Sequence, residues 1–388
     1  MLVRRHILPC VAACLLATLA LVPAVRAGAP APLSNPAYGF PLPGDFATPS
    51  NAASAGLSLA DRWLGDSPYE NPAAKVAQGV QVSPLFQRVS RQDLTSTNRN
   101  VDQNAGYPDV AGGYLSLPVR SWGLVLYAWQ PVLRLEQQAY SQGPIAAPAA
   151  IAQQALQREI RAGVALSRGF GEHLRFGVAG EYLKRDDSYE THEQSGSPNA
   201  GDRVLEFSGN SFGAGAGVAY ARDPDKPWGS WFGAALHYSS ELEVTGTLDE
   251  QLISGSNQLA FTAKRGAEIT GGASARVTVA PATRIVAGIT TRSGAEWSGF
   301  DFGTGTGASY GLGLDWKDPE LPWGARFGVG QESNPDAVER KAGLLSIGFT
   351  WVSGDLVLDI GLLHRNLDRE GFPHSADDRA VGSIRFSF

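Results

Sequence analysis

The sequence predicts an all-β fold: a transmembrane antiparallel β-barrel of about 14 strands, with an N-terminal plug segment in its lumen. Three observations lead to this prediction. Apolar and polar side chains alternate with period two along many segments of roughly ten residues. The 388-residue chain contains 46 glycines, which is too many for a helical protein. After residue 27, no stretch approaches the roughly 18 to 20 consecutive apolar residues that a membrane helix requires.

Residues 1–27 have the layout of a cleavable secretory signal peptide. Two arginines precede an apolar run over residues 7–22, and a small-residue pattern ends at Ala27, where we expect cleavage. A lipoprotein cleavage box at Cys14 is the alternative, but the apolar run continues well past that cysteine. Cleavage after Ala27 would remove both cysteines and make the formal net charge of −6 more negative. We therefore expect no disulfide, no thiol chemistry and no nucleic-acid partner.

Residues 28–78 are expected to form an N-terminal extension and plug, and residues 79–388 the transmembrane barrel. Trp63 would lie on one face of a short helix in the extension. The triplet Asn71-Pro72-Ala73, just before the first strand, is the expected hatch. Proline fixes φ and supplies no N–H, so the preceding asparagine is extended and its side chain is free to hold a turn.

The expected strands follow from alternation and from linker length. Leu345, Ile347 and Phe349, for example, alternate with Ser346 and Gly348. We expect the apolar face to contact lipid and the small or polar face to line the lumen. The expected strands are residues 79–91, 111–118, 121–138, 156–168, 172–186, 204–222, 228–245, 257–279, 283–297, 304–316, 322–332, 341–353, 355–368 and 379–388.

Short connections follow the even-numbered strands, and longer polar ones, such as 139–155 and 187–203, follow most odd-numbered strands. Short periplasmic turns that alternate with longer outer loops are typical of a membrane barrel. An even number of strands brings both ends of the barrel to the periplasmic side. Phe388 would end the closing strand as the aromatic residue that the barrel-assembly machinery recognises.

Several segments are similar to the FadL family of outer-membrane transporters for long-chain fatty acids and other hydrophobic compounds. They are the small-residue stretch at 52–57, the spacer with Asp66, the triplet at 71–73, and the segments 108–118, 123–131 and 297–300. The family's Arg-Gly-Tyr-type strand is not evident near residues 325–331. We expect the barrel to lie in a Gram-negative-type outer membrane. The resemblance implies fourteen strands with an N-terminal hatch in the barrel, and passive uptake of hydrophobic molecules. It also implies that these molecules leave sideways into the bilayer at a distorted third strand.

The third expected strand is apolar on both faces. We place Val125, Tyr127 and Trp129 on the lipid side, because aromatic girdles face lipid, and this leaves the alternate residues facing the lumen. Pro131 interrupts the ladder in mid-strand, where proline requires a bulge or kink. The expected residues of the ligand path are therefore Trp63, Leu124, Leu126, Ala128 and Pro131.

We expect no enzyme activity, no catalytic residues, no cofactor and no resident metal. No local spacing suggests a catalytic triad, which needs three converging groups. An incidental cation site is conceivable where Glu181, Asp186 and Asp187 approach His192 and Glu193. Lumen charges are expected to pair with one another or with the plug: Glu159, Arg161, Arg175, Arg326, Asp359 and Arg385.

The expected partners are a hydrophobic small molecule and outer-membrane lipid, and the protein is expected to be a monomer. The alternative to a transporter of hydrophobic molecules is a general diffusion porin, or a barrel with a structural or adhesive role. A polar lumen without a plug would favour the porin, whereas a plug beside an apolar patch on the third strand favours the transporter.

Overall fold

The computed structural model describes residues 68–73, 79–93, 108–142, 149–195, 200–222, 229–298, 303–304, 306–318, 320–335, 339–369 and 375–388. The expected signal peptide and residues 28–67, with Trp63, lie outside these ranges. In the described ranges, no helix is long and apolar enough to cross a membrane.

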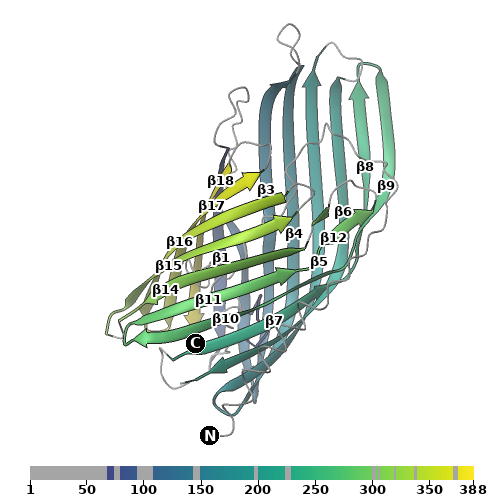
Figure 1. Cartoon of the computed structure of the whole chain (residues 1–388). Helices are drawn as coiled ribbons and strands as arrows, with labels where there is room; N and C mark the ends of the chain where they lie inside the picture. Colours follow the sequence, from purple (N-terminus) through teal and green to yellow (C-terminus); the bar gives the residue numbers. More distant parts are fainter. Residues whose placement is uncertain are drawn as a thin grey trace.

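The described strands form one antiparallel sheet that closes on itself (Figure 1). Closure follows because β1 pairs with β2 on one edge and with β18 on the other. The strands are β1 (Gln81–Asp93), β2 (Pro108–Val119), β3 (Trp122–Gln142), β4 (Ala149–Phe170), β5 (Leu174–Gln194), β6 (Gly201–Ala221), β7 (Trp231–Ser239), β8 (Leu242–Leu252), β9 (Gly255–Arg265), β10 (Glu268–Ala280), β11 (Thr283–Arg292), β12 (Ala295–Ser298), β13 (Gly303–Thr304), β14 (Gly307–Trp316), β15 (Trp323–Pro335), β16 (Glu339–Ser353), β17 (Leu356–Arg369) and β18 (Ser375–Ser387).

The barrel has 14 strand positions, which confirms the predicted number. Four positions hold two consecutive segments each: β7 with β8, β9 with β10, β11 with β12, and β13 with β14. β6, for example, pairs with β7 along one part of its length and with β8 along another. The expectation of one unbroken strand at each of these positions was wrong. In Figure 1, β8 and β9 run upright whereas β7 and β10 are strongly tilted, so the break lies where the wall changes direction.

Short turns connect strands at one end of the barrel, which we call the turn end. They include Arg120–Ser121, Gly171–His173 and Gly354–Asp355, and they match the short connections expected after even-numbered strands. Gly171 and Gly354 have φ of 64° and 57°, a conformation that glycine adopts without a steric penalty. The C-terminus lies toward this same end in Figure 1.

At the opposite end, β3 to β6 together with β8 and β9 extend beyond the other strands (Figure 1). β5 reaches Gln194 and β6 begins at Gly201, so the expected loop 187–203 is mostly strand. Its polar sequence gave the wrong prediction, because the strands continue here with polar side chains on both faces, and Asp187, Thr191 and Arg203 are buried on the inner one. The inner face holds a buried cluster, here called the mouth cluster: Leu183, Tyr189, Leu205, Phe207, Leu242, Val244, Leu248, Ala263 and Trp297.

The outer face of the barrel proper carries exposed apolar side chains. Ile347 and Phe349 are exposed on the outside whereas Ser346 is buried on the lumen side, which confirms the faces expected for this strand. Aromatic pairs lie toward both ends of the apolar region: the rings of Tyr182 and Phe212 are 5.8 Å apart, and those of Trp316 and Trp323 are 5.0 Å apart. This pattern is the one that a wall in contact with hydrocarbon requires.

Candidate functional site

The segment Pro68–Ala73, here called the hatch segment, lies against the inner face of the barrel wall. Asn71 is completely buried. Its Nδ2 donates to the carbonyl oxygens of Val218 on β6, at 3.1 Å, and Ala234 on β7, at 3.4 Å. Its Oδ1 accepts a 2.9 Å hydrogen bond from the Ala73 amide, which is the turn expected of an asparagine before proline. One side chain therefore shapes the segment and attaches it to two strands.

Glycines in the wall allow the hatch segment to approach closely. A Cβ at Gly177 of β5 would lie 2.0 Å from the carbonyl oxygen of Pro72, and one at Gly217 of β6 would lie 2.0 Å from Asn71 Oδ1. His237 of β7 also forms a hydrogen bond with the carbonyl oxygen of Glu70. Alternating glycines inside a strand often mark a close backbone approach, so the glycine run of β6 was the sequence signal for this contact.

The ring of Tyr69 packs among three aromatic side chains of β2 and β3. Its centroid lies 6.0 Å from that of Tyr114, 5.4 Å from that of Tyr127 and 5.7 Å from that of Trp129. We call these three residues the aromatic cage. Tyr69 is 4% exposed, and among the described residues its hydroxyl has no hydrogen-bond acceptor. The ring is thus held by its apolar contacts.

The faces expected for β3 were wrong. Val125, Tyr127 and Trp129 are buried on the lumen side, where they form a cluster with Tyr69. Leu126 is 41% exposed on the outer face, and Leu124 and Ala128 share that face. Alternation separates the two faces of a strand but does not say which one points inward. Here both faces are apolar, and the aromatic side chains point inward because the hatch segment packs on them.

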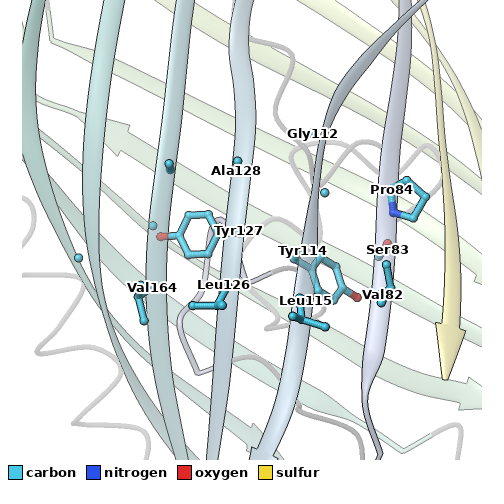
Figure 2. A pocket seen from close by; sticks show the side chains of 14 residues that line it. Val82, Ser83, Pro84, Gly112, Tyr114, Leu115, Leu126, Tyr127, Ala128 and Val164 are labelled. Carbon is cyan, nitrogen blue, oxygen red and sulfur yellow. The ribbon is translucent and has the colours of Figure 1, made fainter. Parts of the chain in front are cut away.

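A hollow of about 780 Å³ lies in the wall beside the aromatic cage (Figure 2). Val82, Leu115, Leu126 and Val164 lie at one level along its outer side. Tyr114 and Tyr127 line it from the inner row of side chains. Small residues complete its lining: Gly112, Gly113, Ala128, Ala162, Gly163 and Gly180. The hollow is thus apolar and is lined from both faces of the wall.

The strand ladders around this hollow are irregular at one level. The pairing of β1 with β2 shifts register after Leu85, opposite Gly112, whose φ is 147°. The pairing of β3 with β4 shifts between Trp129 and Val132, at Pro131, which is the bulge expected for a proline in mid-strand. A Cβ at Gly112 would lie 2.4 Å from the Ala128 carbonyl oxygen, so β2 and β3 touch closely here. Fewer regular ladder bonds make this part of the wall easier to deform than a regular ladder.

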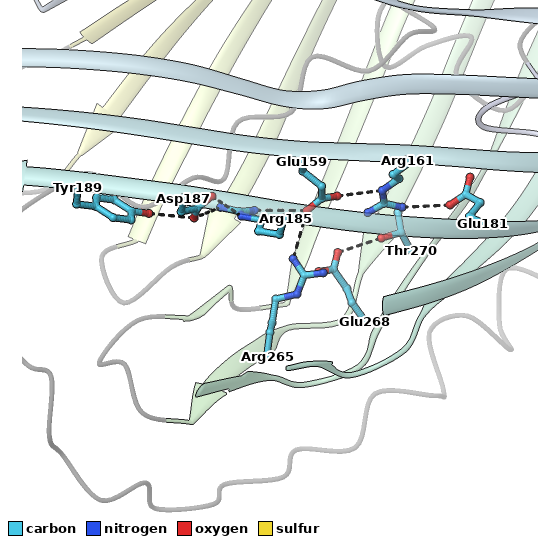
Figure 3. A network of polar contacts seen from close by, with 9 residues as sticks. All are labelled: Glu159, Arg161, Glu181, Arg185, Asp187, Tyr189, Arg265, Glu268 and Thr270. Carbon is cyan, nitrogen blue, oxygen red and sulfur yellow. Dashed lines mark hydrogen bonds and ion pairs between the residues drawn. The ribbon is translucent and has the colours of Figure 1, made fainter. Parts of the chain in front are cut away.

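A network of buried charges lies on the lumen face of β4 and β5 (Figure 3). Glu159 is completely buried, and Arg161 binds its carboxylate at 2.9 Å, Arg185 at 3.4 Å and Arg265 at 3.6 Å. Arg185 also binds Asp187 through two nitrogens, each at 2.8 Å. Arg265 comes from β9, so the network joins two separate parts of the wall.

The network reaches the aromatic cage through two contacts. The Tyr127 hydroxyl donates to Glu181 at 2.7 Å, and the Arg161 guanidinium lies 5.8 Å from the centre of the Trp129 ring. Arg161 also lies 3.5 Å from Glu181. The hatch segment, the cage and the charges on β4 and β5 are therefore one connected set of contacts.

Most lumen charges pair with one another as expected. Glu159 binds Arg161, Asp359 lies 3.5 Å from Arg385, and Arg326 lies 3.5 Å from Asp315. Arg175 instead lies over the ring of Trp231, 5.8 Å from its centre.

The incidental cation site is not found. Asp187 is buried on the lumen side whereas His192 is exposed on the other face of β5, so the residues do not converge. Within the described ranges, no group of three or more acidic, histidine or cysteine residues could hold a metal ion.

The structure brings Asn71, Pro72 and Ala73 together with β5 to β7, and it puts Leu126 and Ala128 at the wall hollow. Leu124 lies outside the lining of the hollow, and Trp63 lies outside the described residues. Sequence reasoning missed the role of Tyr69 and of the glycines that receive the hatch segment. It also missed Arg265, because its contact with Glu159 joins strands far apart in the sequence.

The closed 14-strand barrel has the fold of the FadL-family transporters, which confirms the resemblance found in the sequence at the level of the fold. No protein-family profile and no curated protein sequence matches the chain.

Three solved structures illustrate this similarity, each at 13% sequence identity. The toluene transporter TbuX of Ralstonia pickettii superposes with a TM-score of 0.60, covering 86% of this chain and 99% of its own. A FadL homologue of Pseudomonas aeruginosa gives 0.57, with coverages of 89% and 99%. The toluene transporter TodX of Pseudomonas putida gives 0.56, with coverages of 87% and 97%.

Proposed function

We propose that this protein is an outer-membrane channel for the passive uptake of hydrophobic small molecules. The observation that carries the proposal is the place of Tyr69: a ring of the hatch segment packs in an aromatic cage beside an apolar hollow in the wall. A diffusion porin has a polar, water-filled lumen, in which a buried aromatic cage of this kind is not expected.

In this proposal, a ligand competes with Tyr69 for the aromatic cage. The tyrosine hydroxyl is buried without an acceptor among the described residues, which costs on the order of 1–3 kcal/mol and weakens the hold on the ring. An apolar ligand that lacks a hydroxyl would avoid this cost. Asn71 keeps the rest of the hatch segment attached to β6 and β7 while Tyr69 moves.

The ligand then leaves through the wall hollow into the lipid. The hollow joins the cage to the outer face, its lining carries no charged side chain, and the ladders beside it are irregular. These features support a sideways exit near Gly112, Ala128 and Pro131. With the corrected faces, Leu126 and Ala128 line the outer part of this route and Tyr127 the inner part.

Two ligand classes fit the proposal. The resemblance to the FadL family points to long-chain fatty acids. The structural similarity to toluene transporters and to the CymD monoaromatic hydrocarbon channel points to single-ring hydrocarbons. Uptake of oleate and of toluene by cells that produce the protein distinguishes the two classes.

The function of the hatch segment is tested by conductance in a planar bilayer. The intact protein should conduct almost no ions, and deletion of residues 51–73 should give a steady large conductance. Gly177→Ala should also raise conductance, because its methyl group would overlap the backbone of Pro72. Gly343→Ala is the matched control, since a methyl group there meets nothing within 4 Å. Free ion flow through the intact barrel, unchanged by the deletion, would instead favour the porin.

A further inference from the structure

An exposed arginine lies among aromatic side chains on the outer face of the wall, at the turn end. Trp122 of β3 and Arg168 of β4 are directly paired, and both are exposed on the outer face, in line with Leu166. The Arg168 guanidinium lies 5.3 Å from the centre of the Trp122 ring and 5.5 Å from that of Phe170. We call four residues the interface site: Trp122, Arg168, Phe170 and Phe176.

The three rings of this site lie at the level where lipid headgroups are expected. Phe176 of β5 is directly paired with Arg168, and its ring packs edge-on against that of Phe170, with 5.4 Å between the centres. Phe170 ends β4, so Arg168 lies roughly 7 Å along the strand from the end of the wall. Membrane barrels carry aromatic girdles at both interfaces, beside the headgroups. The site therefore lies at the interface of the turn end.

The Arg168 guanidinium is available to an acceptor from outside the protein. Its contacts with other described residues are those with the two rings, and no oxygen of these residues binds it. Glu172, exposed in the turn after β4, forms no ion pair with it. An aromatic ring does not replace a hydrogen-bond acceptor, so the five N–H donors of the guanidinium remain free to bind one.

A phosphodiester is the acceptor that fits this position. A cation beside hydrocarbon is unfavourable unless water or an anion reaches it. The long arginine side chain can extend its head toward the interface, and its planar fork of N–H groups matches two oxygens of a phosphate. Each phospholipid offers such a group at this depth. The position and the donors of Arg168 thus point to a lipid headgroup.

The outer face beside the site can hold the acyl chains of the same lipid. Leu166 follows Arg168 toward the middle of β4, and Val164 follows Leu166 on the same face; they are 41% and 47% exposed. Val164 also lines the wall hollow. A lipid whose phosphate is held at Arg168 can therefore lay an acyl chain along the wall toward the hollow.

We propose that the interface site binds the phosphodiester headgroup of a phospholipid, whose acyl chains lie along Leu166 and Val164. The proposal rests on the membrane location that is part of the proposed function, but not on the uptake of a hydrophobic molecule. The bound lipid fixes the depth of β3 and β4 in the bilayer, beside the wall hollow.

The test is the binding of lipid to the full chain in detergent, measured by native mass spectrometry during a lipid titration. The probes are palmitoyl-oleoyl phosphatidylglycerol and the diacylglycerol with the same chains, which lacks the phosphate. Phosphatidylglycerol should bind about tenfold more tightly, the effect of one charge-assisted hydrogen-bonded contact. Arg168→Gln should remove this difference. Arg158→Gln is the matched control and should keep it, because Arg158 is exposed on the same face of β4 but away from the interface site.

Three results would overturn the proposal: equal binding of the two lipids by the unaltered chain, a preference that remains in Arg168→Gln, or an equal loss in Arg158→Gln. If Arg168→Gln does not fold, Trp122→Leu removes one ring contact and should weaken phosphatidylglycerol binding several-fold. An unchanged affinity in that variant would equally overturn the proposal. Because bound lipid is measured in detergent, this result is independent of uptake, and a loss of either leaves the other standing.

Discussion

Two residues illustrate how single side chains join the hatch segment to the wall. Asn71 combines a turn within its own segment with hydrogen bonds to β6 and β7. Tyr127 combines a ring contact with Tyr69 and a hydrogen bond to Glu181. In both, the polar atoms find partners on strands that the sequence does not place nearby. A small substitution at either residue therefore tests how much its hydrogen bonds contribute to stability.

Tyr127→Phe should lower the stability of the barrel by about 1.5–3 kcal/mol, because it removes a buried hydrogen bond to a carboxylate while keeping the ring. Tyr114→Phe is the control within the same cage, since no hydrogen bond of the Tyr114 hydroxyl is found among the described residues. Urea unfolding in detergent micelles, followed by tryptophan fluorescence, measures both. Equal losses in the two variants would show that the Glu181 contact contributes little.

At the scale of the strand, β3 is the one whose inward and outward faces differ from those predicted from the sequence. The prediction that Pro131 requires an irregular ladder is confirmed, because proline lacks the N–H that a regular ladder uses. The predicted faces were wrong, because both faces of β3 are apolar. On β14, β16, β17 and β18, only one face is apolar, and there the predicted faces are confirmed.

Ala128→Trp should depress uptake of the hydrophobic substrate, because an indole ring at this position would fill the wall hollow on its outer side. Ala214→Trp is the control, as Ala214 is exposed on the outer face of β6, away from the hollow. Initial uptake rates at matched surface amounts of protein are the measurement. If both variants transport as well as the unaltered chain, the sideways exit is wrong, although the barrel is unaffected.

Ile347→Arg should destabilise the inserted barrel by roughly 2–4 kcal/mol, since Ile347 is 57% exposed on the outer face and arginine is costly within hydrocarbon. Gly343→Arg, on the same face of β16 but nearer the strand's extension end, should cost only about 0–1 kcal/mol, the cost of arginine near a membrane interface. Reversible unfolding from lipid vesicles measures both values. A similar cost at the two positions would show that Ile347 does not lie deeper in the hydrocarbon than Gly343.

At the scale of the whole molecule, closure joins the first described strand to the last. Gln81 of β1 and Ser387 of β18 are direct neighbours, and Gln81 Nε2 donates to Ser387 Oγ at 3.1 Å. The closed sheet leaves β1 and β18 without a free edge along this seam. Closure of the barrel therefore depends on contacts between the first and the last described strands.

Gln81→Cys combined with Ser387→Cys should form a disulfide across this seam, because directly paired residues in a ladder have the spacing that a disulfide needs. The two natural cysteines are replaced by alanine in this experiment. Mobility of the unfolded chain on a non-reducing gel detects the large covalent loop. Gln81→Cys with Ser346→Cys, on β16, is the mismatched pair, and efficient cross-linking there would contradict the closure described.

The sequence by itself determined the fold class, the number of strand positions and the turn at Asn71-Pro72. These follow from local physics: period-two alternation, short turns at every second connection, and the fixed φ of proline. Ion pairs in the lumen such as Glu159 with Arg161 could also be predicted from the sequence, since residues two apart on a strand share a face.

Only the tertiary structure decided which face of β3 points into the lumen. It alone also decided the breaks in four strand positions and how far β3 to β6, β8 and β9 extend beyond the other strands. It also decided the contacts of Tyr69 and of Arg265. Each of these depends on which distant strand or segment packs against a given face. An apolar face can equally well contact lipid or another side chain, so its direction is set by the neighbour that buries it, here the ring of Tyr69 against β3.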